Sequence, residues 1–310
     1  MDRIVDIATD GIHLSAYRGF LIVALDRQEQ GRVALDDIHA IIVHAHGVTW
    51  TTSLVVALAE RGAVMVICAA NHAPVAVISP IDGHHAQAAK MRAQWDAPRP
   101  LFKQLWRQII ITKISMQGSL LAARGKSESN ALAMMARRVR SGDPDNLEAQ
   151  AARKYWPSLM GADFRRDQNA DGANALLNYG YTIMRSCVAR SIIGAGLHPT
   201  IGLHHHNRLN GFALADDLVE PFRPLVDAVV VRMINEGVET VTPDAKRVLA
   251  RLIAHDVRLS GMVSPVSVAI KRLALSLARS FEERRSVLMF FDPPDALDWA
   301  SLGQPAVVES

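Results

Sequence analysis

Histidines and carboxylates gather in one short stretch of the sequence, residues 202–224, which reads GLHHHNRLNGFALADDLVEPFRP. Its candidate ligands are three consecutive histidines and three acids further along: His204, His205, His206, Asp216, Asp217 and Glu220. Imidazole nitrogen and carboxylate oxygen together form a ligand set that binds divalent metal ions. If ADDLVEPF is helical, Asp217 and Glu220 are three residues apart and share one face of that helix. The stretch therefore indicates a candidate metal site.

The acidic part of this stretch also allows a second interpretation. Leu214, Leu218 and Phe222 repeat every four residues and supply the buried face of a helix, so the acids can be the solvated start of that helix. The histidines would then belong to a polar surface loop. Grouped carboxylates raise one another's pKa unless a cation or an arginine compensates them. A divalent ion is the simplest compensation, but this stretch alone leaves both interpretations open.

Positive charge is concentrated between Lys90 and Arg140, although the net charge of the whole chain is only +3. This segment contains eleven lysines and arginines against two acids, Asp96 and Glu128, so it carries +9 and the remainder carries −6. Such asymmetry is typical of a protein that lays one region along a polyphosphate. Solvated amphipathic helices are the alternative, but these normally mix both signs. The distribution favours a nucleic-acid partner.

Two kinds of hydrophobic periodicity divide the chain. Residues 3–80 contain short runs rich in Val and Ile, separated by turn residues, which predict strands. From about residue 86 onward the apolar residues follow a helical period, and the expected helices include 242–259 and 264–291. We therefore predict an α+β fold. Its expected parts are a small β-rich N-terminal domain (1–80), a linker (81–90), a larger all-helical C-terminal catalytic domain (91–291) and a flexible tail (292–310).

The sequence lacks the marks of several functional classes. The first ten residues alternate apolar with acidic and do not read as a signal peptide, and no run is long enough to span a membrane. We therefore expect a cytoplasmic protein without a membrane partner. Cys68 and Cys187 have apolar neighbours and no CxxC partner, so both are expected to be reduced packing residues. Neither a P-loop nor a glycine-rich dinucleotide turn is present.

Further motifs precede the histidine stretch. Glu148 stands in EAQAARKYW, residues 174–181 read NALLNYGY, and residues 196–207 read GLHPTIGLHHHN. Unaided, Glu148 would be interpreted as an ordinary residue of a helix surface. Together with ALADDLVEPFRP, these motifs resemble the CRISPR-associated integrase family, the first of the two Cas proteins that insert new spacers into CRISPR arrays. The resemblance covers nearly the whole chain, is most specific over residues 146–224, and is strongest to the compact type II form.

The resemblance implies a metal-dependent DNA endonuclease and integrase. In the family a glutamate, a histidine and a final acid bind a divalent ion, and by motif these correspond to Glu148, His205 and Glu220. Two carboxylates and one imidazole suit Mg²⁺ or Mn²⁺. Asp217 and His204 are candidate accessory residues, and His204 is also the alternative ligand. The implied reaction is attack of a prespacer 3′-hydroxyl on the CRISPR repeat, a transesterification that needs no ATP.

The basic residues are then expected to hold duplex DNA through phosphate contacts that do not depend on its sequence. The candidates are Lys103, Arg107, Arg137, Arg138, Arg153, Lys154, Arg165 and Arg166. His206 and Asn207 are expected to contact DNA or to orient the metal ligands. Tyr179 and Tyr181 are expected to pack or to face DNA rather than act as nucleophiles, because a metal site makes a tyrosyl intermediate unnecessary.

The partners are implied by the resemblance alone. They are double-stranded DNA, both prespacer and CRISPR repeat; a second copy of the chain in a homodimer, whose contacts we assign to the β-rich domain; a small ferredoxin-like Cas protein that bridges two dimers into a heterohexamer; and, in type II systems, the effector nuclease. Two other functions stay open. One is a non-catalytic DNA-binding scaffold that retains the acidic cluster. The other is a hydrolase with a histidine-rich zinc site, against which the basic segment argues.

Overall fold

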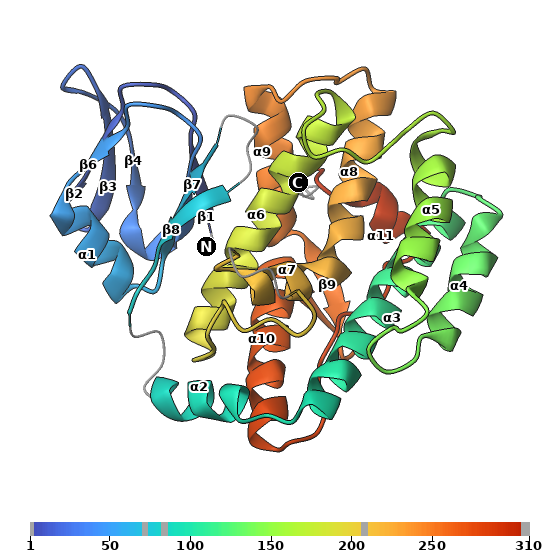
Figure 1. Ribbon diagram of the computed structural model, residues 1–310. Helices are drawn as coiled ribbons and strands as arrows, with labels where there is room; N and C mark the ends of the chain where they lie inside the picture. The colour runs from blue at the N-terminus through green and yellow to red at the C-terminus, as the bar shows by residue number, and fades with distance from the viewer. Residues whose placement is uncertain (1–2, 70–73, 82–85, 206–209, 305–310) are drawn as a thin grey trace.

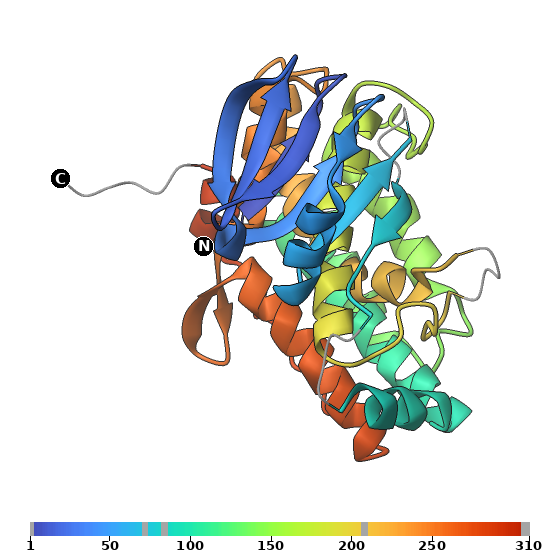
Figure 2. The same ribbon diagram turned by 90° about the vertical axis from the view of Figure 1, so that its left-hand side faces the viewer.

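The computed structural model describes residues 3–69, 74–81, 86–205 and 210–304. Its N-terminal part is built from two four-stranded sheets and one helix, and the rest is largely helical, so the predicted α+β class is confirmed (Figure 1, Figure 2). The N-terminal elements are β1 (Arg3–Ile7), β2 (His13–Tyr17), β3 (Phe20–Leu25), β4 (Gln28–Ala34), the 3-10 helix η1 (Leu35–Asp37), β5 (Ile38–Val43), β6 (Thr49–Trp50), α1 (Thr52–Glu60), β7 (Val64–Cys68) and β8 (Pro74–Ile78).

One sheet has the order β1-β5-β7-β8, with β8 antiparallel to an otherwise parallel set, and the other has the order β4-β3-β2-β6. Strand β5, IHAIIV, is buried along its whole length. Because successive side chains of a strand point to opposite faces, Ile41 and Val43 pack into the core shared with Leu14, whereas Ala40 and Ile42 join the core of the helical part. The first sheet therefore lies between the second sheet and the helices.

The helical part follows without a return to the sheets. Its elements are α2 (Gln87–Trp95), α3 (Arg99–Ala123), α4 (Glu128–Arg138), α5 (Leu147–Met160), α6 (Ala173–Gly194), α7 (Ala213–Val219), η2 (Glu220–Phe222), α8 (Arg223–Asn235), α9 (Pro243–Arg251), η3 (Leu252–Ala254), β9 (Asp256–Leu259), β10 (Met262–Pro265), α10 (Val266–Glu282) and α11 (Ala296–Ser301). Helix α2 thus begins inside the segment 81–90 that we predicted to be a linker.

Helix α6 is the central element of the molecule (Figure 1). It packs against β5 and β7 of the first sheet and against α7, α8, α9 and α10. Apolar residues on most sides of α6 are buried, as expected for a helix with neighbours all around it. Gly180 allows the closest of these approaches, because a Cβ atom at this position would collide with the side chain of Val226 on α8.

A short hairpin corrects the prediction of an all-helical C-terminal part. The predicted helix 242–259 ends at Arg251, and residues 256–265 form β9 and β10, paired in antiparallel fashion. The turn residues Ser260 and Gly261 both have positive φ, 52° and 79°. Such a two-residue turn matches the twist of the strands that flank it, and the Ser-Gly dipeptide was its sequence signal. Helix α10 likewise ends at Glu282 rather than at residue 291.

The predicted flexible tail is wrong for residues 296–302. Asp295 caps α11 with its side chain, and Trp299 of this helix is buried and donates a hydrogen bond from Nε1 to Ser119 Oγ, 2.9 Å away. Arg232 of α8 holds the carbonyl oxygen of Leu302 at 2.6 Å. The segment therefore packs against one end of α3 and of α8.

Across the part of the chain that the structure describes, every helix is too short or too polar to cross a membrane.

A buried carboxylate joins three helices of the helical part. Asp227 of α8 is 1% exposed and accepts hydrogen bonds from the hydroxyls of Tyr155 on α5, at 2.7 Å, and of Tyr181 on α6. Burial raises the pKa of Asp227 to about 6, although the tyrosines and the nearby guanidiniums favour its ionised form. The arrangement fixes α5, α6 and α8 around one polar point in an apolar core.

This raised pKa predicts how stability depends on pH. A carboxyl group whose folded pKa lies near 6, above its ordinary value of 3.8, stabilises the fold at low pH, and that contribution is lost as the pH rises through 6. Asp227→Asn stays neutral, so we expect its melting temperature to rise relative to that of the wild type between pH 4.5 and 7.5. Over this pH window the change corresponds to about 2 kcal/mol.

Thermal unfolding followed at several pH values measures this difference. Asp244→Asn, which alters an exposed carboxylate on α9, is the matched control and is expected to follow the wild-type profile. A constant difference between Asp227→Asn and the wild type over this range would contradict the assignment.

Candidate metal centre

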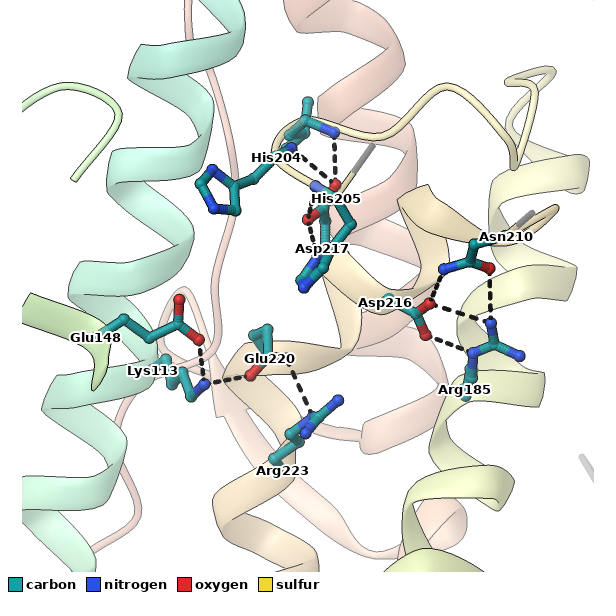
Figure 3. Close-up of polar contacts among 11 residues, drawn as sticks. Lys113, Glu148, Arg185, His204, His205, Asn210, Asp216, Asp217, Glu220 and Arg223 are labelled. Atoms are coloured by element: carbon teal, nitrogen blue, oxygen red, sulfur yellow. Dashed lines mark hydrogen bonds and ion pairs between the residues drawn. The ribbon is translucent and has the colours of Figure 1, made fainter. Parts of the chain in front are cut away.

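Three charged side chains from separate elements meet beside residues 202–205, which we call the histidine loop (Figure 3). Lys113 Nζ of α3 lies 2.6 Å from Glu148 Oε1 of α5 and 2.5 Å from Glu220 Oε2, at the start of η2. On its other side, Glu220 Oε1 lies 3.2 Å from Arg223 Nε. The structure thus brings Glu148 and Glu220, 72 positions apart in the sequence, to one shared cation.

Local structure fixes each of these side chains. The Asp143 carboxylate accepts hydrogen bonds from the backbone N–H groups of Leu147 and Glu148, at 2.9 and 3.0 Å, while the Asn146 side chain caps α5. Glu148 therefore stands in the first turn of a firmly capped helix. Glu220 stands where α7 gives way to a 3-10 turn, and the following Pro221 suits such a start because it needs no N–H partner.

The two carboxylates differ in their contact with solvent. The side chain of Glu220 is 4% exposed, and that of Glu148 is 24% exposed. Burial alone would raise the pKa of Glu220, but Arg223 and Lys113 outweigh it and hold that pKa below its ordinary value. For the lysine the signs are opposite: burial alone would lower the pKa of Lys113. The negative charges of Glu220 and Glu148 outweigh this effect and raise that pKa above its ordinary value. Glu220 and Lys113 are therefore ionised at neutral pH.

Asp217 organises the histidine loop. Its fully buried carboxylate accepts hydrogen bonds from the backbone N–H groups of Leu203, His204 and His205, at 2.5, 3.1 and 3.3 Å. It also contacts His205 Nδ1 at 2.7 Å. Gly202 permits this closeness, because a Cβ atom there would lie 2.9 Å from Asp217 Oδ2. The loop is thus folded around one aspartate of α7.

The two described histidines of the triple have different environments. With Nδ1 of His205 directed at Asp217, its Nε2 is left to bind a ligand, and the side chain is 42% exposed. The hydrogen bond to Asp217 raises the pKa of His205. The ring of His204 instead stacks on Trp106, with the centroids 4.5 Å apart. His205 is therefore the better placed ligand, while His206 and Asn207 lie outside the described residues.

Asp216, next to Asp217, belongs to a different set of contacts. Its carboxylate pairs with the guanidinium of Arg185 on α6, at 2.5 Å, and accepts a hydrogen bond from Asn210 Nδ2 at 2.6 Å. The pKa of Asp216 stays below its ordinary value because these contacts outweigh its burial. Of the two adjacent aspartates, Asp217 supports His205 and Asp216 ties the loop to α6.

The chemistry of these side chains fits a divalent ion. Glu148 and Glu220 share the ammonium of Lys113, and nearby the contact of His205 with Asp217 uses Nδ1, not Nε2. Glu220 Oε2 is buried and forms no well-aligned hydrogen bond, so its contact with Lys113 is electrostatic. Within residues 3–69, 74–81, 86–205 and 210–304, however, no three ligand-type side chains converge on one point. Lys113 lies between two of the candidate ligands, Glu148 and Glu220.

Comparison with known proteins identifies the family. The description "CRISPR associated protein Cas1" matches residues 5–248. A CRISPR-associated endonuclease Cas1 of Neisseria meningitidis serogroup C (strain 8013) is 33% identical over 280 residues, which are 89% of this chain and 91% of that protein. This chain belongs to the Cas1 family. The membership that the sequence motifs predicted is thereby confirmed.

Other members of the Cas1 family and related folds agree. A CRISPR-associated endonuclease Cas1 2 of Pyrobaculum aerophilum is 28% identical over 295 residues, 88% of this chain and 97% of that protein. A casposase bound to integration product is similar in structure, with a TM-score of 0.78, 21% identity and 92% of both chains covered. A Cas6-RT-Cas1–Cas2 complex gives a TM-score of 0.74 at 19% identity, over 94% of this chain and 36% of that one. These structures support the Cas1 fold.

The candidate DNA-binding residues separate into exposed and internal ones. Seven of the eight are exposed: Lys103, Arg107, Arg137, Arg138, Arg153, Lys154 and Arg165. Arg107 and Arg137 line a groove of about 460 Å³ between α3 and α4. Arg166 is half-buried and donates hydrogen bonds to the side chains of Asn174 and Asn178, so its guanidinium serves the fold.

Sequence reasoning missed the residues that join the ligands. We counted Lys113 within the basic segment expected to hold DNA, but it is buried and paired with two carboxylates. Trp106, which contacts His204 and His205, lies two turns before Lys113 on α3. A lone lysine two turns after a tryptophan in an apolar helical run was the available signal. Tyr179 and Tyr181, as expected, are buried packing residues.

We expect Asp217→Asn to weaken metal binding. In the wild type, three backbone N–H groups of the loop and His205 Nδ1 contact the Asp217 carboxylate. An asparagine offers them one acceptor oxygen and an NH₂ group, which is itself a donor. The loop therefore loses part of its support, and the imidazole of His205 loses its orientation. The affinity for Mn²⁺ is expected to fall about 10–100-fold, together with a lower melting temperature. Calorimetric titration of Mn²⁺ into the protein with duplex DNA present measures the effect.

Asp216→Asn is the matched control for this prediction, because it removes a neighbouring carboxylate that contacts Arg185 rather than His205. Its Mn²⁺ affinity is expected to fall less than that of Asp217→Asn, because His205 keeps its contact with Asp217 although the loop loses its tie to α6. Equal losses in both variants would show that Asp217 has no particular part in orienting the imidazole.

Proposed function

We propose that this protein is a divalent-metal-dependent DNA endonuclease and integrase of CRISPR adaptation, which joins prespacer 3′-hydroxyl ends to the CRISPR repeat. One observation carries the proposal. Glu148 and Glu220 converge on one cation beside a histidine loop whose exposed imidazole is oriented through Nδ1. The names of the relatives agree, since the Neisseria protein is called an endonuclease and the casposase is bound to an integration product.

In the proposed mechanism Glu148, His205 and Glu220 hold Mg²⁺ or Mn²⁺. The ion would polarise the phosphoryl group, lower the pKa of the attacking hydroxyl and stabilise the leaving 3′-oxygen. The chain itself orients the ligands: Asp217 fixes the imidazole, and Arg223 holds Glu220 by an ion pair. Transesterification exchanges one phosphodiester for another, so no nucleotide hydrolysis is needed.

The proposal includes the partners of such a reaction. Duplex DNA would lie along the exposed basic residues of α3, α4 and α5, whose charge suits phosphate contacts. We further propose a homodimer and a heterohexamer with a small ferredoxin-like Cas protein, since chains in Cas6-RT-Cas1–Cas2 complexes share this fold. In a type II system the effector nuclease would assist the choice of prespacer. All of this would take place in the cytoplasm, where the CRISPR array lies.

Neutralising the ligands is expected to abolish strand transfer. Two variants, Glu148→Gln and Glu220→Gln, remove a negative charge from the site and change the side-chain volume little. The third, His205→Ala, removes the lone pair of the imidazole. We expect a loss of at least about 10³-fold in joined product, an order typical of removing one essential group. The assay combines a short duplex, a repeat-bearing plasmid and Mn²⁺ or Mg²⁺.

The control is Glu236→Gln, which alters an exposed glutamate at the end of α8 and is expected to leave strand transfer unchanged. Circular dichroism and the melting temperature establish that the variants are folded. If all three site variants still join DNA, the metal-dependent assignment fails. Salt-dependent duplex binding that ignores both metal and these substitutions would instead favour a non-catalytic scaffold.

A second prediction concerns the basic surface. Arg137→Gln combined with Arg138→Gln removes two exposed charges at the end of α4, so duplex binding is expected to weaken equally for unrelated sequences. The slope of log Kd against log salt concentration is expected to fall by about 2, because each lost phosphate contact removes close to one released counterion. Fluorescence anisotropy over a salt series measures it.

Arg247→Gln on α9, an exposed arginine paired with Asp244, is the control and is expected to leave the slope unaltered. An unchanged slope in the double variant would place the DNA on another face of the molecule.

A further inference from the structure

The charges around Lys113 cancel. Two carboxylates, Glu148 and Glu220, and two cations, Lys113 and Arg223, form a chain of contacts at 2.6, 2.5 and 3.2 Å. The set is therefore electrically neutral as it stands. A divalent ion added to it would bring two positive charges into a largely buried place, where uncompensated charge is costly.

The two cations are not equivalent. Arg223 contacts Glu220 alone among these acids, and its guanidinium lies over the ring of Tyr181 at 4.8 Å, so packing holds it in place. Lys113 carries a compact charge on a flexible four-carbon stem and touches both acids. Of the two cations, Lys113 is the one able to leave without disturbing its own helix.

The position of the ammonium also matters. It lies between Glu220, whose side chain is 4% exposed, and Glu148, whose side chain is 24% exposed. A cation that arrives from solvent thus reaches Glu148 first and finds the approach to Glu220 taken by Lys113. The two acids cannot bind one metal ion while this ammonium separates them.

We propose that Lys113 is the resident counter-cation of the metal centre, and that a divalent ion binds by displacing its ammonium from between Glu148 and Glu220. This inference rests on the proposed function. It assigns Lys113 a positioning role, since it acts through the two ligands.

Replacing Lys113 with methionine tests the displacement. Lys113→Met keeps the length of the stem and removes its charge, so Mn²⁺ no longer competes with an ammonium. Without DNA, the affinity for Mn²⁺ is expected to rise about tenfold or more, as loss of one nearby unit charge suggests. The metal-free melting temperature is expected to fall, and its increase on adding Mn²⁺ to exceed that of the wild type.

Lys113→Arg is the matched control, because it keeps the charge and is expected to bind Mn²⁺ no better than the wild type. Calorimetric titration gives the affinities, and circular dichroism checks the fold. Unchanged or weaker Mn²⁺ binding by folded Lys113→Met would overturn the proposal.

A measurement on the wild type covers the case in which Lys113→Met does not fold. Displacement releases the ammonium from its two carboxylates, so acetylation of Lys113 by a water-soluble acylating reagent, followed by mass spectrometry, is expected to speed up several-fold with Mn²⁺. Lys90, which pairs with Glu282, is the internal reference and is expected to react at a constant rate. An unchanged rate at Lys113 in metal-saturated protein would overturn the proposal.

These outcomes separate the inference from the proposed function. If the wild type performs metal-dependent strand transfer but Lys113 neither competes with Mn²⁺ nor changes reactivity, only the displacement is wrong. If the wild type shows no metal-dependent strand transfer while Lys113→Met gains Mn²⁺ affinity, the counter-cation role holds and the enzymatic proposal fails.

Discussion

The buried carboxylate of Glu220 is the constraint on which the site depends. An ionised carboxylate inside a protein needs paired charge, because leaving it uncompensated costs several kcal/mol, on the order of 3–5 for a broken buried pair. Lys113 from α3 and Arg223 from α8 supply that charge. The elements α3, η2 and α8 must therefore lie close enough for these three side chains to touch. Glu148 of α5 joins the same cluster, because Lys113 also contacts its carboxylate.

Much of the fold could be predicted from periodicity, and the exceptions have local causes. Alternation in residues 3–80 and the helical period after residue 86 identify the two halves of the chain. The β9–β10 hairpin escaped notice because residues 242–259 keep a helical apolar pattern past Arg251, where α9 ends, and into β9. Helix α11 (Ala296–Ser301) escaped notice because its attachment depends on distant partners of Trp299, which no local pattern reveals.

The site could be predicted only in part, for a related reason. Motif resemblance assigned Glu148, His205 and Glu220, which residue spacing alone could not have joined across 72 positions. It left the adjacent aspartates undecided, and the structure distinguishes them by what each contacts: the histidine loop for Asp217 and Arg185 for Asp216. Lys113 was missed because a lysine reads as a surface cation until its burial and its partners are known, and its place in an apolar helical run was the one local signal.

Helix α6 links the β-rich part to the candidate metal centre by packing against both. Its first face packs on β5 and β7, through the core that includes Ala40 and Ile42. Its other faces place Tyr181 beneath Arg223 and direct Arg185 to Asp216. A shift of the first sheet would therefore move the residues that hold Glu220 and the histidine loop. Because interiors are packed as densely as crystals, such a shift is transmitted rather than absorbed. The first sheet thus supports the helix that positions Tyr181 and Arg185.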